Sequence, residues 1–403
     1  MSRRRASWSA VVVAAGLALA GCANGGGSGA GSEDTYLVMV SAVGGDAGPL
    51  TDILGTAVVA AKAAAKVIKQ DGGVAGRRIE IVSSPDNADP TKALTALRAQ
   101  IAERKPDTYL VVGGTNLSAA VAPILKQNGI LFMNSGTIPE TGDPEQNPLA
   151  FNLAPLPDVP VDAFVPEFKA NDYHKIGIIH GNSVYAQEFS KLAKDSYAKA
   201  GFDVVGVAEY DAAALDMTPQ LSALQAKAPD VLVLNGYGAP VGYLLKGLAK
   251  LGWDVPVLGE TSVAGTSLVA LPPPDGVLGT PEVEQLKIEV MKSVIYDPAA
   301  KATNAAVEAM TSVGEIRTSL IQAWNYDGLM LVAAAAKAVG SADDPAKLAA
   351  ALEDRTVTGG AKTALFTSYN FSADSHNARP DPGDYSFTPP TKLVNGQFGH
   401  PDS

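Results

Sequence analysis

Residues 109–133, YLVVGGTNLSAAVAPILKQNGILFM, contain the pattern that decides the fold. An apolar run typical of a buried strand, residues 109–112, is followed by two glycines and then by a helical pattern over residues 117–127. A second apolar run closes the unit at residues 130–133. Strand, helix and strand in this order predict a βαβ unit, in which two parallel strands share a sheet and the helix covers one of its faces.

The same alternation continues on both sides of this unit. Upstream, the sequence predicts strands at residues 36–40 and 78–82 and helices at residues 51–70 and 90–103. After a loop rich in proline and asparagine, residues 138–160, the alternation restarts. The strands predicted there are residues 176–179, 204–207, 231–234 and 255–258, and the helices are residues 184–199, 219–227 and 241–251. The fold class is therefore α/β, with two doubly wound parallel-sheet lobes in succession.

The last third of the chain has a different pattern. Beyond Pro281 it is mostly helical, with long stretches at residues 283–295 and 318–339. Helices without strands must pack on a sheet that formed earlier, so we expect the chain to cross back to the first lobe. Residues 380–403 show little periodicity and are predicted to form a surface tail.

The first residues have the features of an export signal. Arg3-Arg4-Arg5 precedes an apolar stretch, residues 8–20, which is shorter than the roughly 20 residues that a membrane-spanning helix needs. Leu19-Ala20-Gly21-Cys22 resembles the lipobox of bacterial lipoproteins, and a Gly/Ser-rich stretch follows it. We expect a signal peptide over residues 1–21, a lipid anchor on Cys22 and a flexible tether over residues 22–34. The alternative is an ordinary cleaved signal with an incidental cysteine.

Composition and charge exclude several classes of function. The formal net charge is −11 and the leader holds three arginines but no acid, so the body is more acidic still and nucleic acid is not an expected partner. With Cys22 as the single cysteine, neither an intrachain disulfide nor a multi-cysteine metal site can form. The four histidines are scattered, and neither a catalytic constellation nor a phosphate-binding glycine motif stands out. We expect no enzyme, no cofactor and no metal.

Polar loops follow the predicted strands at the edge where open α/β sheets bind ligands. They are residues 113–116, 134–137, 181–185, 235–238 and 259–261. These loops hold hydroxyls, glycines, tyrosines and the carboxylate of Glu260. Hydroxyls and backbone N–H groups suit a carboxylate, and Glu260 suits an ammonium, so the set can hold a zwitterion. Taken singly, each loop is better explained as an ordinary turn after a strand, and it is the five loops together that favour a binding site.

Several stretches together resemble the type I periplasmic solute-binding proteins of the leucine/isoleucine/valine-binding class. These are residues 69–80 (KQDGGVAGRRIE), 86–90 (DNADP), 111–115 (VVGGT), 128–130 (NGI), 135–140 (SGTIPE), 176–179 (IGII), Tyr185, 229–231 (PDV), 259–260 (GE) and 326–327 (YD). The resemblance extends from about residue 36 to about residue 371. It implies two lobes joined by three crossovers that close on a ligand. The implied first and second lobes are residues 35–155 with about 284–364, and residues 156–283 with about 365–403.

The resemblance also implies roles for particular residues. In the first lobe, Thr115 and the stretch Ser135-Gly136-Thr137 would hold an amino-acid carboxylate. In the second lobe, Tyr237 would contact the ligand and Glu260 would meet its ammonium. Glu260 is expected to be solvated when the cleft is open. Tyr185 and Tyr326 would line the cleft. One departure concerns side-chain specificity, because Ile53 or Leu54 stands where family members often have an aromatic residue.

The function implied is that of a monomeric, extracytoplasmic lipoprotein that binds a solute for the permease of an ABC importer. Its expected ligand is an amino acid, branched-chain or similar, or a close analogue, and its lipid anchor holds it to the bacterial cell membrane. Two alternatives remain open. One is a ligand-sensing receptor of the same fold, and the other is a binding protein for a solute such as an amide or an aromatic acid.

Overall fold

The computed structural model describes residues 34–401 except 43–50, 112–113, 137 and 266. The first of its two sheets has five parallel strands in the order β2-β1-β3-β4-β5. Their bounds are β1 (Thr35–Ala42), β2 (Arg78–Pro85), β3 (Thr108–Leu110), β4 (Leu131–Asn134) and β5 (Ala150–Asn152). The predicted βαβ unit is confirmed, because β3 and β4 are parallel neighbours.

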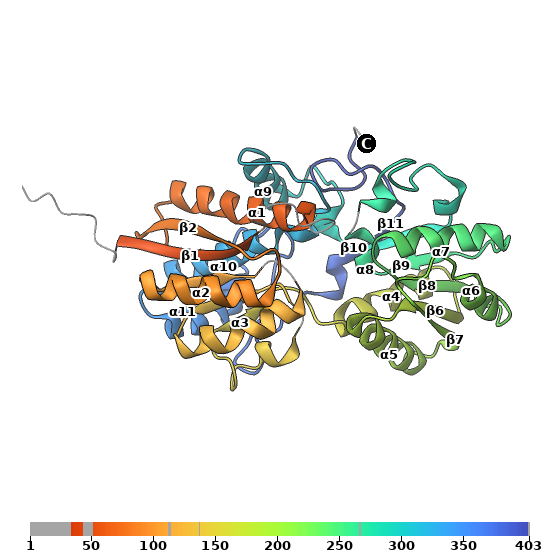
Figure 1. Cartoon of the computed structure of the whole chain (residues 1–403), viewed down its shortest axis with the longest axis horizontal. Helices are drawn as coiled ribbons and strands as arrows, with labels where there is room; N and C mark the ends of the chain where they lie inside the picture. Colours follow the sequence, from red (N-terminus) through yellow and green to blue (C-terminus); the bar gives the residue numbers. More distant parts are fainter. Residues whose placement is uncertain (1–33, 43–50, 112–113, 137, 266, 402–403) are drawn as a thin grey trace, which may run out of the picture. The chain divides into compact units, whose positions relative to one another are not determined.

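Helices cover both faces of this first sheet (Figure 1). Alternate residues of β1 point to opposite faces of the sheet. Val38 and Val40 belong to the core cluster that contains α1 and α10, whereas Met39 belongs to the core cluster that contains α2 and α3. This is the period-two pattern of a strand buried on both sides. The helices of this lobe are α1 (Thr51–Gln70), α2 (Pro90–Glu103), α3 (Thr115–Gln127), α9 (Lys301–Thr311), α10 (Trp324–Val339), α11 (Pro345–Leu352) and α12 (Arg355–Thr358).

Local sequence accounts for where the first helices begin and how they pack. The Asp89 side chain accepts hydrogen bonds from the Thr91 and Lys92 backbone N–H groups at 2.8 and 3.1 Å, and Pro90 takes the first position of α2. These contacts supply partners for orphan N–H groups at the start of the helix. On α1, the buried alanines Ala60 and Ala64 leave room for the close approach of α10. The predicted helices at residues 51–70 and 90–103 are confirmed.

The second sheet has six strands in the order β11-β10-β9-β8-β6-β7, and only β11 within it is antiparallel to its neighbour. Its strands are β6 (Lys175–Gly181), β7 (Asp203–Tyr210), β8 (Val231–Asn235), β9 (Val257–Gly259), β10 (Leu286–Met291) and β11 (Tyr385–Thr388). The helices of this lobe are α4 (Asp158–Ala170), α5 (Val184–Lys199), α6 (Thr218–Gln225), α7 (Ala239–Lys250) and α8 (Thr261–Ala264). The α4 and α5 helices pack together and share one core cluster with the sheet.

Two expectations about the last third of the chain are wrong. The predicted helix over residues 283–295 contains strand β10 instead, whose buried Ile288 and Val290 suit a sheet interior between β9 and β11. The predicted surface tail contains β11, and Phe398 near its end is fully buried. Both elements acquire their structure from pairing with distant segments, which local periodicity does not report.

The chain passes between the sheets at three places: after β5 into α4, after β10 into α9, and between Ala378 and β11. Ala378 still belongs to the first lobe, because its N–H donates to the Asn152 carbonyl oxygen at 2.9 Å. The expected lobe boundaries at about 284 and 365 are therefore both too early: β10 lies in the second sheet, and the chain around residue 378 stays with the first. No helix in the described residues is long and apolar enough to cross a membrane.

Candidate functional site

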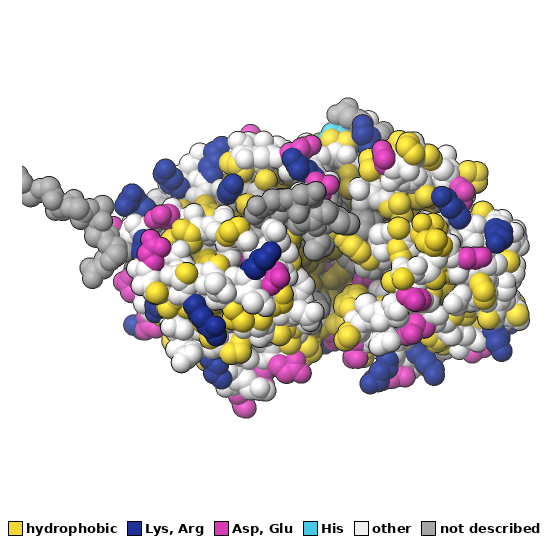
Figure 2. Space-filling model, viewed as in Figure 1, with side chains coloured by type: hydrophobic (Ala, Val, Ile, Leu, Met, Phe, Trp, Pro, Cys, Tyr) yellow, Lys and Arg dark blue, Asp and Glu magenta, His cyan; other side chains and the backbone are white. Residues whose placement is uncertain are grey.

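Two adjoining hollows lie at the carboxyl ends of the strands, the edge predicted to bind a ligand. Figure 2 shows the surface hollowed between the two lobes, with hydrophobic side chains inside. The two hollows are called here the first-lobe hollow, with a volume of about 300 Å³, and the second-lobe hollow, with a volume of about 230 Å³. Tyr237, Gln322 and Trp324 line both. The first-lobe hollow is further lined by Ile53, Leu54, Ala57, Ala88, Val111, Gly114, Ser135 and Asn325. The second-lobe hollow is further lined by Ala154, Pro155, Pro160, Tyr185, Glu260, Thr261, Ser262, Gly265, Met291, Ile321 and Tyr385.

Glu260 is the carboxylate of the second-lobe hollow. It follows β9 directly and caps the short helix α8, and its side chain is only 1% exposed. Oε1 accepts a hydrogen bond from the Tyr185 hydroxyl at 2.8 Å. Oε2 accepts from the Asn235 amide at 2.8 Å, from the Ser262 N–H at 3.0 Å and from the Ser262 hydroxyl. In this structure Glu260 is therefore not solvated, as was expected for an open cleft, but is buried and held by neutral donors.

A second buried carboxylate lies beside Glu260. Glu289 on β10 is 0% exposed and accepts a hydrogen bond from the Thr261 hydroxyl at 2.9 Å. Burial raises the pKa of Glu260, and burial together with the nearby charge of Glu260 raises the pKa of Glu289 well above its usual range. Neither carboxylate forms an ion pair with a described residue. Only Glu260 of the two lines the second-lobe hollow. Because two buried carboxylates without a counter-charge repel each other, the surroundings of Glu260 favour a ligand that carries a positive charge.

The first-lobe residues predicted to hold a carboxylate are only partly brought together. Ser135 lines the first-lobe hollow and donates its hydroxyl to the Val111 carbonyl oxygen at 2.9 Å. Gly114, the N-cap of α3, lines the same hollow, whereas Thr115 beside it is exposed and is not among the lining residues. Gly136 is buried, and a side chain there would collide with the Ser118 side chain. Thr137 lies outside the described residues.

Of the three tyrosines predicted to contact the ligand, two line a hollow and one does not. Tyr185 lines the second-lobe hollow and Tyr237 lines both hollows. Gly238 follows Tyr237 with φ of 70°, a backbone conformation suited to glycine, and so turns the chain from the end of β8 into α7. Tyr326 lines neither hollow; it is 3% exposed, and burial raises its pKa to about 12. Its place in the wall is taken by Trp324, two residues earlier.

The sequence analysis missed several lining residues, among them Gln322, Trp324, Asn325 and Tyr385. The first three lie at the start of α10 or in the turn before it, inside a stretch that the sequence predicts only as one long helix. Their closeness in sequence to Tyr326, a predicted site residue, was the one feature that could have indicated them. Tyr385 belongs to β11, a strand that was not predicted because residues 380–403 show little periodicity.

Asp327, next to Tyr326, has a structural role. Its carboxylate accepts hydrogen bonds from the Ala364 and Leu365 N–H groups at 2.5 and 3.0 Å and from the Tyr369 hydroxyl at 2.5 Å. Burial raises its pKa to about 6. These bonds tie the chain after α12 to α10, and they account for an acidic residue that lines neither hollow.

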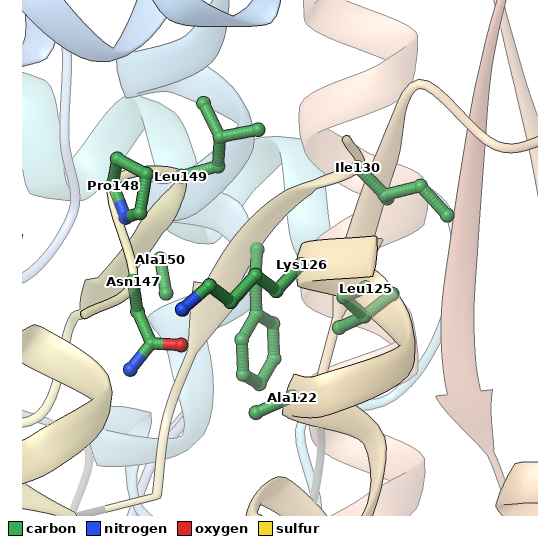
Figure 3. Close-up of a pocket in the computed structure, with 9 residues that line it drawn as sticks. Ala122, Leu125, Lys126, Ile130, Asn147, Pro148, Leu149 and Ala150 are labelled. Carbon is green, nitrogen blue, oxygen red and sulfur yellow. The ribbon is translucent and has the colours of Figure 1, made fainter. Parts of the chain in front are cut away.

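A separate and much smaller hollow, of about 30 Å³, lies between α3 and the chain just before and into β5 (Figure 3). Leu125, Ile130 and Leu149 contribute to its mostly apolar lining, with Lys126 and Asn147 among its polar members. It shares no residue with the two larger hollows. Among the described residues, no group of three or more metal-ligating side chains comes together. Cys22 lies outside the described residues.

Two α/β sheets linked by three crossovers, with ligand-sized hollows at the strand ends, define a binding protein of the type I periplasmic-binding-protein fold. A family model described as "Periplasmic binding protein" matches residues 38–381. The chain therefore belongs to the periplasmic binding protein family, a class of solute-binding proteins rather than enzymes.

Individual relatives agree with this placement. The chain is similar to Leu/Ile/Val-binding protein homolog 3 of Brucella melitensis, 24% identical over 73% of this chain and 77% of that protein. It is similar to the Leu/Ile/Val-binding protein of Escherichia coli K12, 24% identical over 79% of this chain and 84% of that protein. Its fold is similar to that of a type 1 periplasmic binding protein from Bordetella pertussis Tohama I, with a TM-score of 0.68, 21% identity, and coverage of 88% of this chain and 96% of that one.

Proposed function

We propose that this chain is the extracytoplasmic solute-binding lipoprotein of an ABC importer, and that it binds an amino acid or a close analogue by closure of its two lobes. Membership of the periplasmic binding protein family supports the binding role. The names of the relatives from Brucella and Escherichia support an amino acid as the ligand. The lipobox-like Leu19-Ala20-Gly21-Cys22 supports the anchor.

The observation that carries the proposal is the environment of Glu260. This carboxylate is held in the wall of the second-lobe hollow by the hydroxyls of Tyr185 and Ser262 and the amide of Asn235. All of these donors are neutral, so they fix the carboxylate without neutralising it. A ligand ammonium that enters this hollow would supply the missing counter-charge.

The other end of the ligand would meet neutral donors. No lysine, arginine or histidine lines either hollow among the described residues. A carboxylate would instead meet the Ser135 hydroxyl and the free N–H groups that begin α3 next to Gly114. This chemistry suits a carboxylate that belongs to a zwitterion. It disfavours an aromatic acid, which would add a negative charge to the site and leave Glu260 without a counter-charge.

A ligand panel tests the proposal. The purified chain is titrated with amino acids and, separately, with acids of matched size that lack the amine, for example phenylalanine against 3-phenylpropionate. A ligand present at 100 times its dissociation constant stabilises a protein by about 2.7 kcal/mol, which a thermal-shift assay detects. We expect stabilisation by at least one amino acid and by none of the acids. Stabilisation by the acids alone would contradict the proposal.

Cell fractionation tests the anchor. Cys22→Ser removes the only thiol of the chain, so it should release the protein from the membrane fraction or leave the leader uncleaved without changing the fold. Ser28→Ala, in the same Gly/Ser-rich stretch, is the matched control and should stay in the membrane fraction. A Cys22→Ser variant that is cleaved and still bound to membranes would show that the lipobox assignment is wrong.

A further inference from the structure

Asn325, the second residue of α10, lines the first-lobe hollow, and its side-chain amide is incompletely hydrogen-bonded. Its side chain is 99% buried, and Nδ2 donates to the Ala57 carbonyl oxygen on α1 at 3.3 Å. No described residue donates to Oδ1. Because a carbonyl oxygen can only accept, it fixes which end of the amide faces α1 and leaves Oδ1 as the acceptor without a partner.

Buried acceptors of this kind are rare, because an unsatisfied buried polar group destabilises the folded state. A hydrogen-bond donor on a ligand in this hollow would satisfy Oδ1 and recover that free energy. Oδ1 therefore selects for a donor group and against an apolar group of the same shape.

Gln322 supplies a second amide next to the same space. It lies in the turn before α10, is half-buried and lines both hollows. Its side-chain amide makes no hydrogen bond with a described residue. Asn325 Oδ1 needs a hydrogen-bond donor, and the Gln322 amide can both donate and accept. Together they are complementary to a polar ligand group that can donate as well as accept hydrogen bonds.

The rest of the first-lobe hollow limits what that group can be. Ile53, Leu54, Ala57, Ala88 and Val111 give it an apolar lining, and no described lining residue of this hollow carries a charge. The ligand's own carboxylate would use Ser135 and the start of α3 in this hollow, so a second charge, on the tip of the ligand's side chain, would be desolvated without a counter-ion. The complementary ligand is therefore one with a neutral hydrogen-bonding tip on a short apolar stem.

We propose that Asn325 and Gln322 form a polar subsite for the ligand's side chain, and that the solute is an amino acid whose side chain ends in a carboxamide or a hydroxyl. The subsite rests on the proposed function, since it assumes that the ligand's ammonium meets Glu260. The subsite predicts that the ligand's side chain is polar and that a purely aliphatic branched side chain binds less tightly than a polar one of similar size.

Calorimetric titration of the full chain with near-isosteric pairs tests this subsite. The pairs are glutamine with methionine, asparagine with leucine, and tyrosine with phenylalanine. We expect the polar member of at least one pair to bind roughly 10-fold to 100-fold more tightly than its apolar partner. Asn325→Leu should remove most of that preference, and Gln322→Met should reduce it at least severalfold. Asn304→Leu on α9 changes an amide that lines neither hollow and should leave the preference unchanged.

The outcomes separate the two proposals. If amino acids bind and the apolar member of every pair binds at least as tightly as the polar one, the subsite is wrong and the amino-acid function stands. If the preference exists but survives both substitutions, Asn325 and Gln322 are not its source and the subsite is again wrong. If no amino acid binds and acids do, both proposals fall. Should Asn325→Leu fail to fold, as judged by circular dichroism, Gln322→Met at its half-buried position decides the test.

Discussion

The two walls of the site differ in charge and in how complete their hydrogen bonding is. In the second-lobe hollow, Glu260 is ionisable and already accepts four hydrogen bonds from described neighbours. In the first-lobe hollow, the polar groups are neutral, and Asn325 keeps an acceptor that no described residue satisfies. Under the proposed function, one wall would be preorganised for the ligand's charge before the ligand arrives, and the hydrogen bonding of the other would be completed only by the ligand.

The largest expected effect comes from removing the charge of the second wall. Glu260→Gln keeps the shape of the side chain but removes the partner of a ligand ammonium in a desolvated site. Such a loss typically costs about 2–5 kcal/mol, which is roughly 30-fold to several-thousand-fold in affinity. Calorimetric titration with the best amino acid of the panel measures it, and Glu284→Gln, at an exposed carboxylate, is the matched control.

The same titrations would also test whether recognition of the ligand's charge and recognition of its side chain belong to different walls. Glu260→Gln should weaken both members of every isosteric pair by a similar factor, since the ammonium is common to them. If it changed the preference between glutamine and methionine instead, charge and side-chain recognition would not be separable between the walls.

Trp324 belongs to both walls, so its loss should affect all ligands alike. It lines both hollows, and its ring lies 5.7 Å from that of Phe366. Buried aromatic residues at the centre of a binding site commonly contribute about 2 kcal/mol or more, so we expect Trp324→Leu to lower affinity by roughly 30-fold. The same titrations should show an unchanged ratio within each pair. A selective loss for one member would assign Trp324 to a single wall.

Glu289, which is buried near Glu260 but lines neither hollow, should leave a signature in the pH dependence of stability. The pKa of Glu289 is raised in the folded state, so the folded protein binds its proton at a higher pH than the unfolded chain does. This carboxylate therefore favours folding at low pH, and that contribution is lost as the pH rises above the ordinary glutamate value of about 4.3. Glu289→Gln should become more stable relative to the parent as the pH rises from about 4 to 8.

Urea denaturation at several pH values measures this difference. Asn325→Leu, in the neutral wall, should show the same pH dependence as the parent, because it changes no titratable group. A difference between Glu289→Gln and the parent that stays constant across this range would contradict the raised pKa.

The smallest expected effect concerns the connection between the walls. Arg379, in the third crossover, donates from Nη1 and Nη2 to Asp158 Oδ2 at 2.6 and 2.7 Å, and Asp158 begins α4 after the first crossover. This pair is largely exposed, so Arg379→Ala should cost at most about 1 kcal/mol, or roughly fivefold in affinity through the closure equilibrium. Small-angle scattering with and without ligand, together with titration, would detect the change. A loss confined to one ligand of a pair would indicate that the walls do not move as rigid bodies.

The parts of the fold that the sequence predicted are those specified by local patterns. The helix predicted at residues 184–199 and the strand at residues 231–234 carry their own periodicity, capping and apolar runs, and both are confirmed. Strand β10 was mistaken for a helix because its neighbours decide its conformation. One of them, β11, follows it only after all the helices from α9 to α12.

In the candidate site, too, the residues that could be predicted are those indicated by a local pattern. Glu260 was identifiable because it follows a clear strand at the ligand-binding edge of a sheet. Trp324 and Asn325 were not, because only the packing of α10 against α1 decides which side chains of its first turn line the hollow. Tyr326, chosen from the sequence, turns away into the core.

The position of β11 has a consequence for how the chain becomes a folded protein. Both lobes contain segments from the last part of the sequence: Ala378 completes the edge beside β5, and β11 covers the edge of β10. A chain that emerges N-terminus first from a ribosome therefore exposes the edge of β10 until β11 has followed it. During that interval the open edge can pair with another chain. Removal of the segment from Tyr385 onward would make this exposure permanent, so the second lobe is vulnerable to aggregation at a point far from its ligand.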